Sequence, residues 1–229
     1  MRRSGHDALA VKPLAGRRVV VTRPLEMSWT AREAVKTRSF WLLLLSFNFG
    51  SMAAGALVVH QIPYMQDKGF TVQAAGVASL VAFVHLIVKP FWGFLIERIH
   101  IRYCIMLAFS FALTGVVTLR FADSVPLLYL FAVFFGIGNG AFGILIAVSW
   151  ADYFGRQSIG AIRGITMPFN IMVGAGTPLF AAWISDTYHS YDLVMYIFTV
   201  AYVLGIGCVF LARPPRKIEA GKVPDIFVS

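Results

Sequence analysis

The stretch AFVHLIVKPFWGFLIER, residues 82–98, places a histidine and a lysine one helical turn apart inside a long apolar run. With the residues before it, this run extends over residues 74–96 and ends at Glu97 and Arg98. A helix needs about 20 predominantly apolar residues to cross a bilayer. The stretch therefore predicts a membrane-spanning helix that carries two ionisable side chains, His85 and Lys89, inside the hydrocarbon.

The composition of the whole chain is that of a membrane protein. Of its 229 residues, 58% are hydrophobic and only 14% are charged, and the mean hydropathy is +0.73. A soluble domain usually carries about 25% charged residues. The net charge of +9 does not indicate nucleic-acid binding, because Lys and Arg lie at the chain ends and in short gaps between apolar runs.

Five other apolar runs are long enough to span a bilayer. The six expected spans are residues 40–64, 74–96, 103–119, 125–150, 162–184 and 193–211. Short connections with turn residues separate them, such as QDKGFT at 66–71. The predicted fold is therefore an all-α integral membrane bundle of six transmembrane helices, residues 40–213. A basic lead-in, 1–39, precedes it and is expected to be largely disordered, and a tail, 214–229, follows.

The basic residues predict the orientation in the lipid bilayer. Seventeen of the 20 Lys and Arg fall on the side of the two termini: nine in residues 1–39, then Arg98, Arg102, Arg156, Arg163, Arg213, Arg216, Lys217 and Lys222. Loops rich in Lys and Arg stay in the cytoplasm. We expect a multi-pass protein of the cell membrane with both termini cytoplasmic. No apolar core of a cleavable signal peptide occurs in residues 1–39.

The sequence offers little for catalysis or metal binding. Cys104 and Cys208 lie in separate apolar runs, with no CxxC or His-rich spacing. Motifs such as HExxH, GxSxG and a Gly-rich phosphate loop are absent. We therefore expect no enzyme activity, no cofactor and no metal, although a small membrane enzyme remains an alternative.

The fourth run contains FFGIGNGAFG, residues 134–143, in which Gly136 and Gly140 form a GxxxG pair. Small residues at this spacing let another helix approach closely in a membrane. Asn139 lies between Gly138 and Gly140. Two interpretations stay open for it: tight packing alone, or a side chain that faces a substrate cavity.

The fifth run contains MPFNIMVGAGTPLF, residues 167–180, with Pro168 and Pro178 on either side of Gly174 and Gly176. Each proline removes a backbone donor, and such interrupted helices occur in membranes where they line a cavity or contact protein. Asn170 is a polar partner for a freed carbonyl. The alternatives are a moving or cavity-lining helix and a simple kink.

His85 and Lys89 lie four residues apart and therefore on one face of a helix. Small or polar residues continue that face, which we expect to face the bundle interior: Ala78, Ala82, Gly93 and Glu97. Ionisable side chains facing a membrane bundle are candidates for function. Lysine can hold an anion, and histidine can exchange a proton near neutral pH. The alternative for Lys89 is snorkelling to the cytoplasmic headgroups.

GFLIERIHIR, residues 93–102, resembles the signature loop of the major facilitator superfamily, G-x-L-x-D/E-R followed by basic residues. The matching positions are Gly93, Leu95, Glu97, Arg98 and Arg102. In that family the loop joins the second and third helices of each six-helix half, and here it joins the second and third spans. The resemblance implies that Gly93 permits close helix contact and that Glu97 and Arg98 form a cytoplasmic latch between two halves.

Within that superfamily, AFVHLIVKPFWG (82–93) and DYFGRQSIGAIRGI (152–165) resemble the monocarboxylate-transporter and oxalate/formate-antiporter branch. There, an arginine followed by proline binds the substrate carboxylate, with an aspartate one turn earlier. Lys89 and Pro90 occupy the arginine–proline position, and His85 that of the aspartate. Lysine keeps the charge but loses bidentate recognition. The lysine that oxalate transporters carry in the fifth span is missing, so the resemblance favours a monocarboxylate over oxalate.

The resemblance covers residues 28–213 and matches the C-terminal six-helix half of a twelve-helix transporter. It implies a secondary transporter that moves a small organic anion by alternating access. Lys89, His85, Asn139 and Asn170 are the expected binding or coupling residues, with His85 exchanging a proton. The missing N-terminal half implies a fragment, or a half that pairs with a second six-helix chain. The remaining alternative is a non-transporting membrane sensor or assembly protein.

Overall fold

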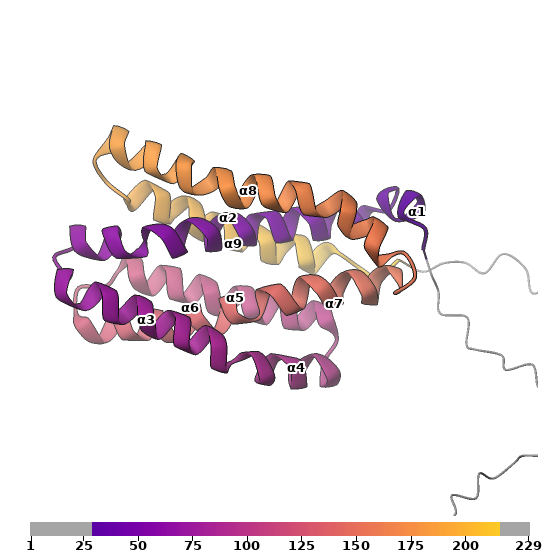
Figure 1. Ribbon diagram of the computed structural model, residues 1–229, viewed down its shortest axis with the longest axis horizontal. Coiled ribbons are helices and arrows are strands. Elements are labelled where there is room, and N and C mark those ends of the chain that lie inside the picture. Colours follow the sequence, from indigo (N-terminus) through magenta and orange to yellow (C-terminus); the bar gives the residue numbers. More distant parts are fainter. Residues whose placement is uncertain (1–28, 216–229) are drawn as a thin grey trace, which may run out of the picture.

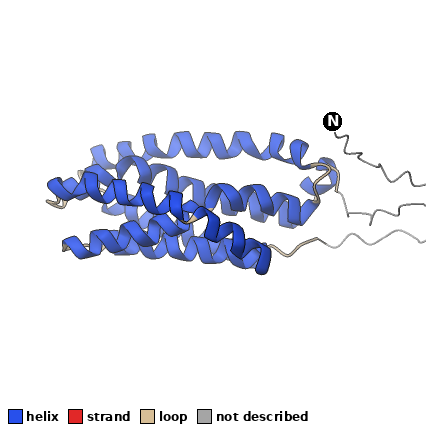
Figure 2. Cartoon of the chain, turned by 60° about the horizontal axis from the view of Figure 1, so that its bottom comes forward, coloured by secondary structure: helices blue, strands red, loops and turns tan. Residues whose placement is uncertain are grey.

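The computed structural model of the chain describes residues 29–215, and this part forms helices joined by short loops, without strands (Figures 1 and 2). The helices are α1 (Ala31–Val35), α2 (Arg38–Asp67), α3 (Thr71–Ile87), α4 (Lys89–Arg98), α5 (Ile101–Arg120), α6 (Val125–Gly140), α7 (Phe142–Phe154), α8 (Ile159–Tyr188) and α9 (Asp192–Leu211).

The helices account for six membrane spans. Four are single apolar helices, α2, α5, α8 and α9, and α6 with α7 forms a fifth from Val125 to Phe154. The sixth consists of α3 and α4, which are bent by 41° where they meet at Val88. The predicted all-helical membrane fold is thus confirmed. The bend follows from Pro90, which cannot donate to the carbonyl four residues earlier.

The spans form two layers with an internal repeat. In Figure 1, α8, α2, α7, α3 and α4 lie toward the viewer, whereas α9, α5 and α6 lie behind them. The two central helices have equivalent neighbours: α2 packs on α8 and α9, and α6 packs on α3 and α5. α2 and α6 start at opposite ends of the bundle. The first three spans and the last three therefore form an inverted repeat, with equivalent neighbours and opposite orientation.

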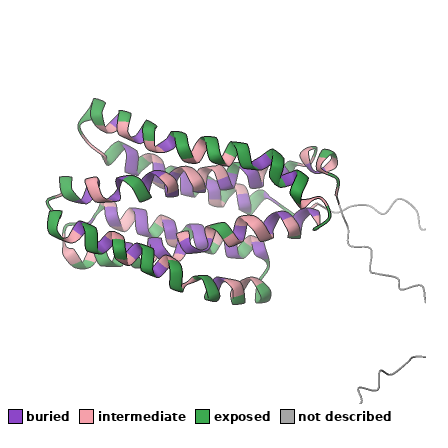
Figure 3. Ribbon diagram, in the orientation of Figure 1, coloured by how far each residue is buried: buried purple, intermediate pink, exposed green. Residues whose placement is uncertain are grey.

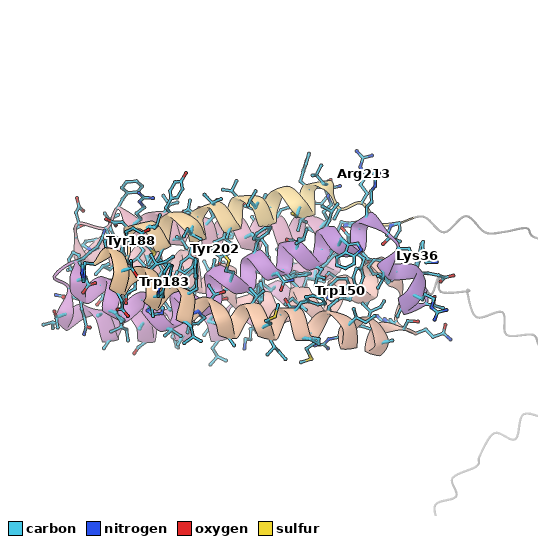
Figure 4. The ribbon with its side chains drawn as sticks, turned by 90° about the horizontal axis from the view of Figure 1, so that it is seen from above. Lys36, Trp150, Trp183, Tyr188, Tyr202 and Arg213 are labelled. Carbon is cyan, nitrogen blue, oxygen red and sulfur yellow. The ribbon has the colours of Figure 1, made fainter. Side chains whose placement is uncertain are left out.

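Both described ends of the chain lie at one end of the bundle, which we call the terminal end. Tyr153 Oη donates to the carbonyl of Ala212 over 3.0 Å, and Ser39 Oγ donates to that of Arg213. Figure 4 shows Lys36 and Arg213 at this end and Tyr188 at the other, which we call the distal end. The predicted cytoplasmic location of both termini requires such a common end, but the side of the membrane remains a prediction.

The described part of the expected lead-in is structured rather than disordered. Thr30 and Glu33 form a reciprocal capping box at the start of α1, and the Trp29 amide donates to the carbonyl of Phe154 over 3.0 Å. A capping box satisfies two backbone donors of a helix start. Residues 1–28 of the lead-in, and 216–229 of the tail, lie outside the described residues.

Close helix approach in the centre of the bundle depends on glycine. A Cβ on Gly136 would lie 2.8 Å from Val84 of α3, and one on Gly138 would lie 2.9 Å from the Cα of Ala112 of α5. Gly140 faces α3 as well. Alternate glycines of α6 thus contact helices on its two opposite sides, which brings α3, α6 and α5 together as small residues do in membranes.

Burial differs strongly between the spans (Figure 3). In the most apolar part of α8 only 17% of the residues are buried, against 39–50% for the other single-helix spans and the α6–α7 span. Exposed residues also cover much of α3 and α4. The surface formed by α8, α3 and α4 is therefore the less covered face of the bundle, and we call it the open face.

Candidate functional site

The break between α3 and α4 positions the two ionisable residues of the second span. His85 lies in the last turn of α3, where it is half-buried, and Lys89 is the exposed first residue of α4. The backbone of His85 packs on α6, since its Cα would lie 3.3 Å from a Cβ on Gly140. The position of His85 in the bundle is therefore determined by a glycine of the neighbouring helix.

The face of α3 that packs into the bundle is not the expected one. Val77, Val81 and Val84 are buried, and Val84 contacts the Gly136 position of α6. The small and polar side lies on one flank of this valine face and is half-buried or exposed: Ala78, Ala82, His85 and Lys89. The expectation that this side faces the packed interior was wrong, because branched valines fill the groove that the glycines of α6 leave.

The opposite flank of α3 is apolar and exposed. Phe83 and Ile87 project there, with exposed fractions of 59% and 56%. Such a surface suits lipid, since in a membrane lipid tails are as apolar as these side chains. The flank with His85 and Lys89 does not suit lipid.

Asn139 is half-buried near the end of α6. At about 100° per residue, it lies between the side of α6 that faces α3 and the side that faces α5, on the same side as the buried Ala132 and Leu128. The exposed Leu130 and Val133 lie on the other side. Asn139 thus points toward the inner side of α6 rather than toward lipid.

Asn170 of α8 and Asn48 of α2 make the same type of contact. Asn170 Nδ2 donates to the carbonyl of Thr166 over 3.1 Å, and Asn48 Nδ2 donates to that of Leu44 over 2.9 Å. A carbonyl can only accept, so the amide orientation is determined and each Oδ1 is the free atom. Both Oδ1 atoms are buried with no hydrogen-bond partner. Asn48 was not among the predicted site residues, although it is an amide inside an apolar run in the same way as Asn139 and Asn170.

The five polar residues lie at similar depth in the bundle. Counted along their helices from the terminal end at 1.5 Å per residue, Lys89, Asn48, Asn170, His85 and Asn139 lie about 14 to 22 Å deep. A 30-residue helix such as α2 is about 45 Å long, so this level is near its middle. Four different spans therefore contribute polar groups to one level of the bundle.

Lys89 supplies a positive charge at the depth that these five polar residues share. The carboxylates of the described chain lie near the two ends of the spans: Glu33, Asp67, Glu97, Asp123, Asp152, Asp186 and Asp192. An ammonium group in a medium of low dielectric strongly favours an anionic partner. A cation at this level could hold an anion, and the amides of Asn48, Asn139 and Asn170 and the ring of His85 lie at similar depth.

The residues of the signature loop have separate surroundings. Gly93 has open space where a Cβ would project, and Leu95 packs against the core. Glu97 is exposed, and Arg98 lies 4.6 Å from the ring centroid of Phe94. Arg102 instead donates to the carbonyls of Val209, over 3.2 Å, and Phe210 at the end of α9. A latch to a second half stays a prediction for Gly93, Glu97 and Arg98, while Arg102 is used inside this bundle.

The prolines do not interrupt α8, which runs from Ile159 to Tyr188 as one helix through Pro168 and Pro178. Gly174 lies against α2, where its carbonyl oxygen would be 3.3 Å from a Cβ on Gly55. Gly176 has open space around it. The fifth span is thus a continuous helix that approaches α2 closely at one glycine.

A polar hollow of about 790 Å³ lies at the distal end, away from the level of Lys89. It is lined by the ends of α2 and α8 and by the start of α9, with Tyr64, Asp67, Asp186 and Asp192 among the lining residues. Lys68 there donates to the carbonyls of Leu119, Arg120 and Ala122 at the end of α5. Burial lowers the pKa of Lys68, and Asp192 and Asp123 oppose that shift.

Comparison with known proteins identifies the family. The family model described as Major Facilitator Superfamily matches residues 40–225. Monocarboxylate transporter 12 of Rattus norvegicus is 27% identical over 191 residues, which cover 81% of this chain and 39% of that protein. Monocarboxylate transporter 2 of Mesocricetus auratus is 30% identical over 135 residues, covering 57% of this chain and 28% of that protein. The chain spans less than half the length of these relatives.

The predicted membership is confirmed by this match, which includes all six spans and the signature loop. The relatives are transporters by name. The chain is a multi-pass membrane protein that belongs to the Major Facilitator Superfamily, with monocarboxylate transporters among its relatives.

Proposed function

We propose that the chain is the C-terminal six-helix half of a secondary transporter that moves a small monocarboxylate across the cell membrane by alternating access. The observation that carries this proposal is Lys89, the one Lys or Arg that lies at mid-depth among residues 29–215, where it is exposed on the open face of the bundle. A carboxylate there would gain an ammonium partner in a medium of low dielectric.

The partner of the open face is a second six-helix bundle. Glycines on the front layer have open space where a Cβ would project, for example Gly93 of α4 and Gly164 of α8, whereas Gly136 and Gly138 of α6 are filled by neighbours. Alternating access requires two bundles that rock around a site near the membrane centre. An N-terminal six-helix half is the favoured partner, and a second copy of this chain is the alternative.

In this arrangement His85 exchanges a proton with the substrate pathway, and Asn139 and Asn170 line the site. Their common depth with Lys89 supports this role. Both termini are cytoplasmic, as the distribution of basic residues favours. The proposed latch of Gly93, Glu97 and Arg98 then acts at the cytoplasmic side.

The proposal is tested by uptake of radiolabelled acetate, pyruvate and lactate into proteoliposomes that contain the chain together with its N-terminal six-helix partner. Lys89→Ala should abolish uptake, while Lys89→Arg should retain part of it because the charge is kept. Lys36→Ala is the matched control, since that lysine lies at the terminal end outside the spans. Normal uptake by Lys89→Ala would remove the binding role.

A further inference from the structure

In the distal half of α8, residues 178–188, only Ala181 and Ile184 are buried in the bundle. Leu179, Trp183 and Tyr188 are 74%, 60% and 61% exposed, and Figure 4 shows Trp183 and Tyr188 on this part of the helix. Pro178 cannot donate to the carbonyl of Gly174, and neither Gly174 nor Gly176 has a side chain that could pack. The helix therefore lacks one backbone hydrogen bond where its distal half begins.

One histidine of another helix makes a side-chain hydrogen bond to this half. His60 of α2 is only 8% exposed, and its Nε2 lies 2.9 Å from the carbonyl oxygen of Pro178. Its Nδ1 lies 3.3 Å from Tyr191 Oη, just before α9. Among the residues that the structure describes, this is the side-chain hydrogen bond that links residues 178–188 to another helix.

The chemistry of the contacts determines which nitrogen carries the proton. The carbonyl of Pro178 can only accept, so Nε2 must be the N–H donor. In the tautomer that carries its proton on Nε2, Nδ1 accepts from the hydroxyl of Tyr191. The ring of Tyr191 also packs against His60, with centroids 5.5 Å apart. His60 thus connects α2, to which it belongs, with α8 and with Tyr191, the residue before α9.

We propose that His60 is a positioning residue that clamps the distal half of α8 to α2 and to the start of α9, so that this half moves together with α2. The close contact of Gly174 with Gly55 already joins the middle of α8 to α2, and His60 extends that connection beyond Pro178. The clamp needs only these contacts. Its consequence, that α2 and the distal half of α8 move as one unit during transport, rests on the proposed function.

Hydrogen–deuterium exchange of the whole chain in lipid nanodiscs tests the clamp without substrate. His60→Leu removes the donor to Pro178, and we expect about tenfold faster exchange in residues 182–188, with residues 162–172 of the same helix unchanged. His60→Gln can donate to the same carbonyl and should stay within about twofold of the wild type. Tyr191→Phe removes the hydroxyl that orients the ring and should increase exchange by about threefold.

Unchanged exchange in His60→Leu would overturn the proposal, and so would equal acceleration in both halves of α8 or a failure of His60→Gln to restore protection. If His60→Leu does not fold, Tyr191→Phe decides: exchange at the wild-type rate in residues 182–188 overturns the clamp. Uptake is measured separately. If His60→Leu exchanges faster in residues 182–188 but the wild type shows no uptake, the clamp stands and the proposed function is refuted. If the wild type shows uptake but exchange in His60→Leu is unchanged, the proposed function stands and the clamp is refuted.

Discussion

The carbonyl oxygen of His85 lies 2.9 Å from the point where a side chain on Gly140 would begin. The two residues belong to different spans, and their contact connects the packing of α3 on α6 with the ionisable pair on the open face. Any side chain at residue 140 must push the backbone of α3 away. The position of His85, and with it that of Lys89, thus depends on the absence of one Cβ.

Gly140→Ala should therefore damage both stability and binding. Overpacking of this kind costs about 1–3 kcal/mol in unfolding free energy, because the opposing atoms include the backbone of His85 as well as the side chain of Val88. We also expect weaker monocarboxylate uptake, since His85 and Lys89 shift with α3. Unfolding in mixed micelles and uptake measure the two effects. Gly143→Ala is the control, with open space around it, and equal effects of the two variants would contradict the packing argument.

His85→Asn should flatten the pH dependence of uptake between about pH 5 and 8, where histidine ordinarily changes charge. Asparagine keeps a polar side chain of similar reach but takes up no proton. The control is His189→Asn, because His189 is exposed at the distal end with φ of 51°, a conformation that asparagine adopts readily. An unchanged pH profile in His85→Asn would exclude it from proton coupling.

Asn170→Leu should separate stability from function. The variant removes a buried Oδ1 that has no partner, so the free energy of unfolding should stay equal or rise by up to about 1 kcal/mol. Uptake should fall, since the level of Lys89 loses a polar group. Asn48→Leu, with the same contact pattern in α2, should behave alike. A large loss of stability would mean that Oδ1 has a structural partner.

Lys68→Met tests the linkage between pH and stability at the distal end. Because burial lowers the pKa of Lys68 in the folded chain, the unfolded chain binds more protons between that lowered pKa and about 10.5. Stability should therefore rise with pH in this window, and the rise should be smaller in Lys68→Met. Thermal unfolding from pH 8 to 10.5 measures the difference between the two proteins. A steeper rise in the variant would contradict the sign.

The sequence alone determined the fold class, the family and the identity of the ionisable pair. Long apolar runs predict spans because each must satisfy its own backbone inside lipid, so six spans could be predicted without any tertiary contact. The signature residues Gly93, Glu97 and Arg98 are contiguous, and the resemblance they carry needed no fold. His85 and Lys89 were found because charge inside an apolar run is costly.

The tertiary structure decided which side of each helix is covered. Valines of α3 rather than its small polar side pack into the bundle, because the glycines of α6 leave a groove on that side. Arg102 contacts the end of α9, and His60 contacts Pro178, over 107 and 118 residues of sequence separation. Such contacts depend on how distant helices fit together. A local pattern of hydrophobicity and charge carries no information about that fit.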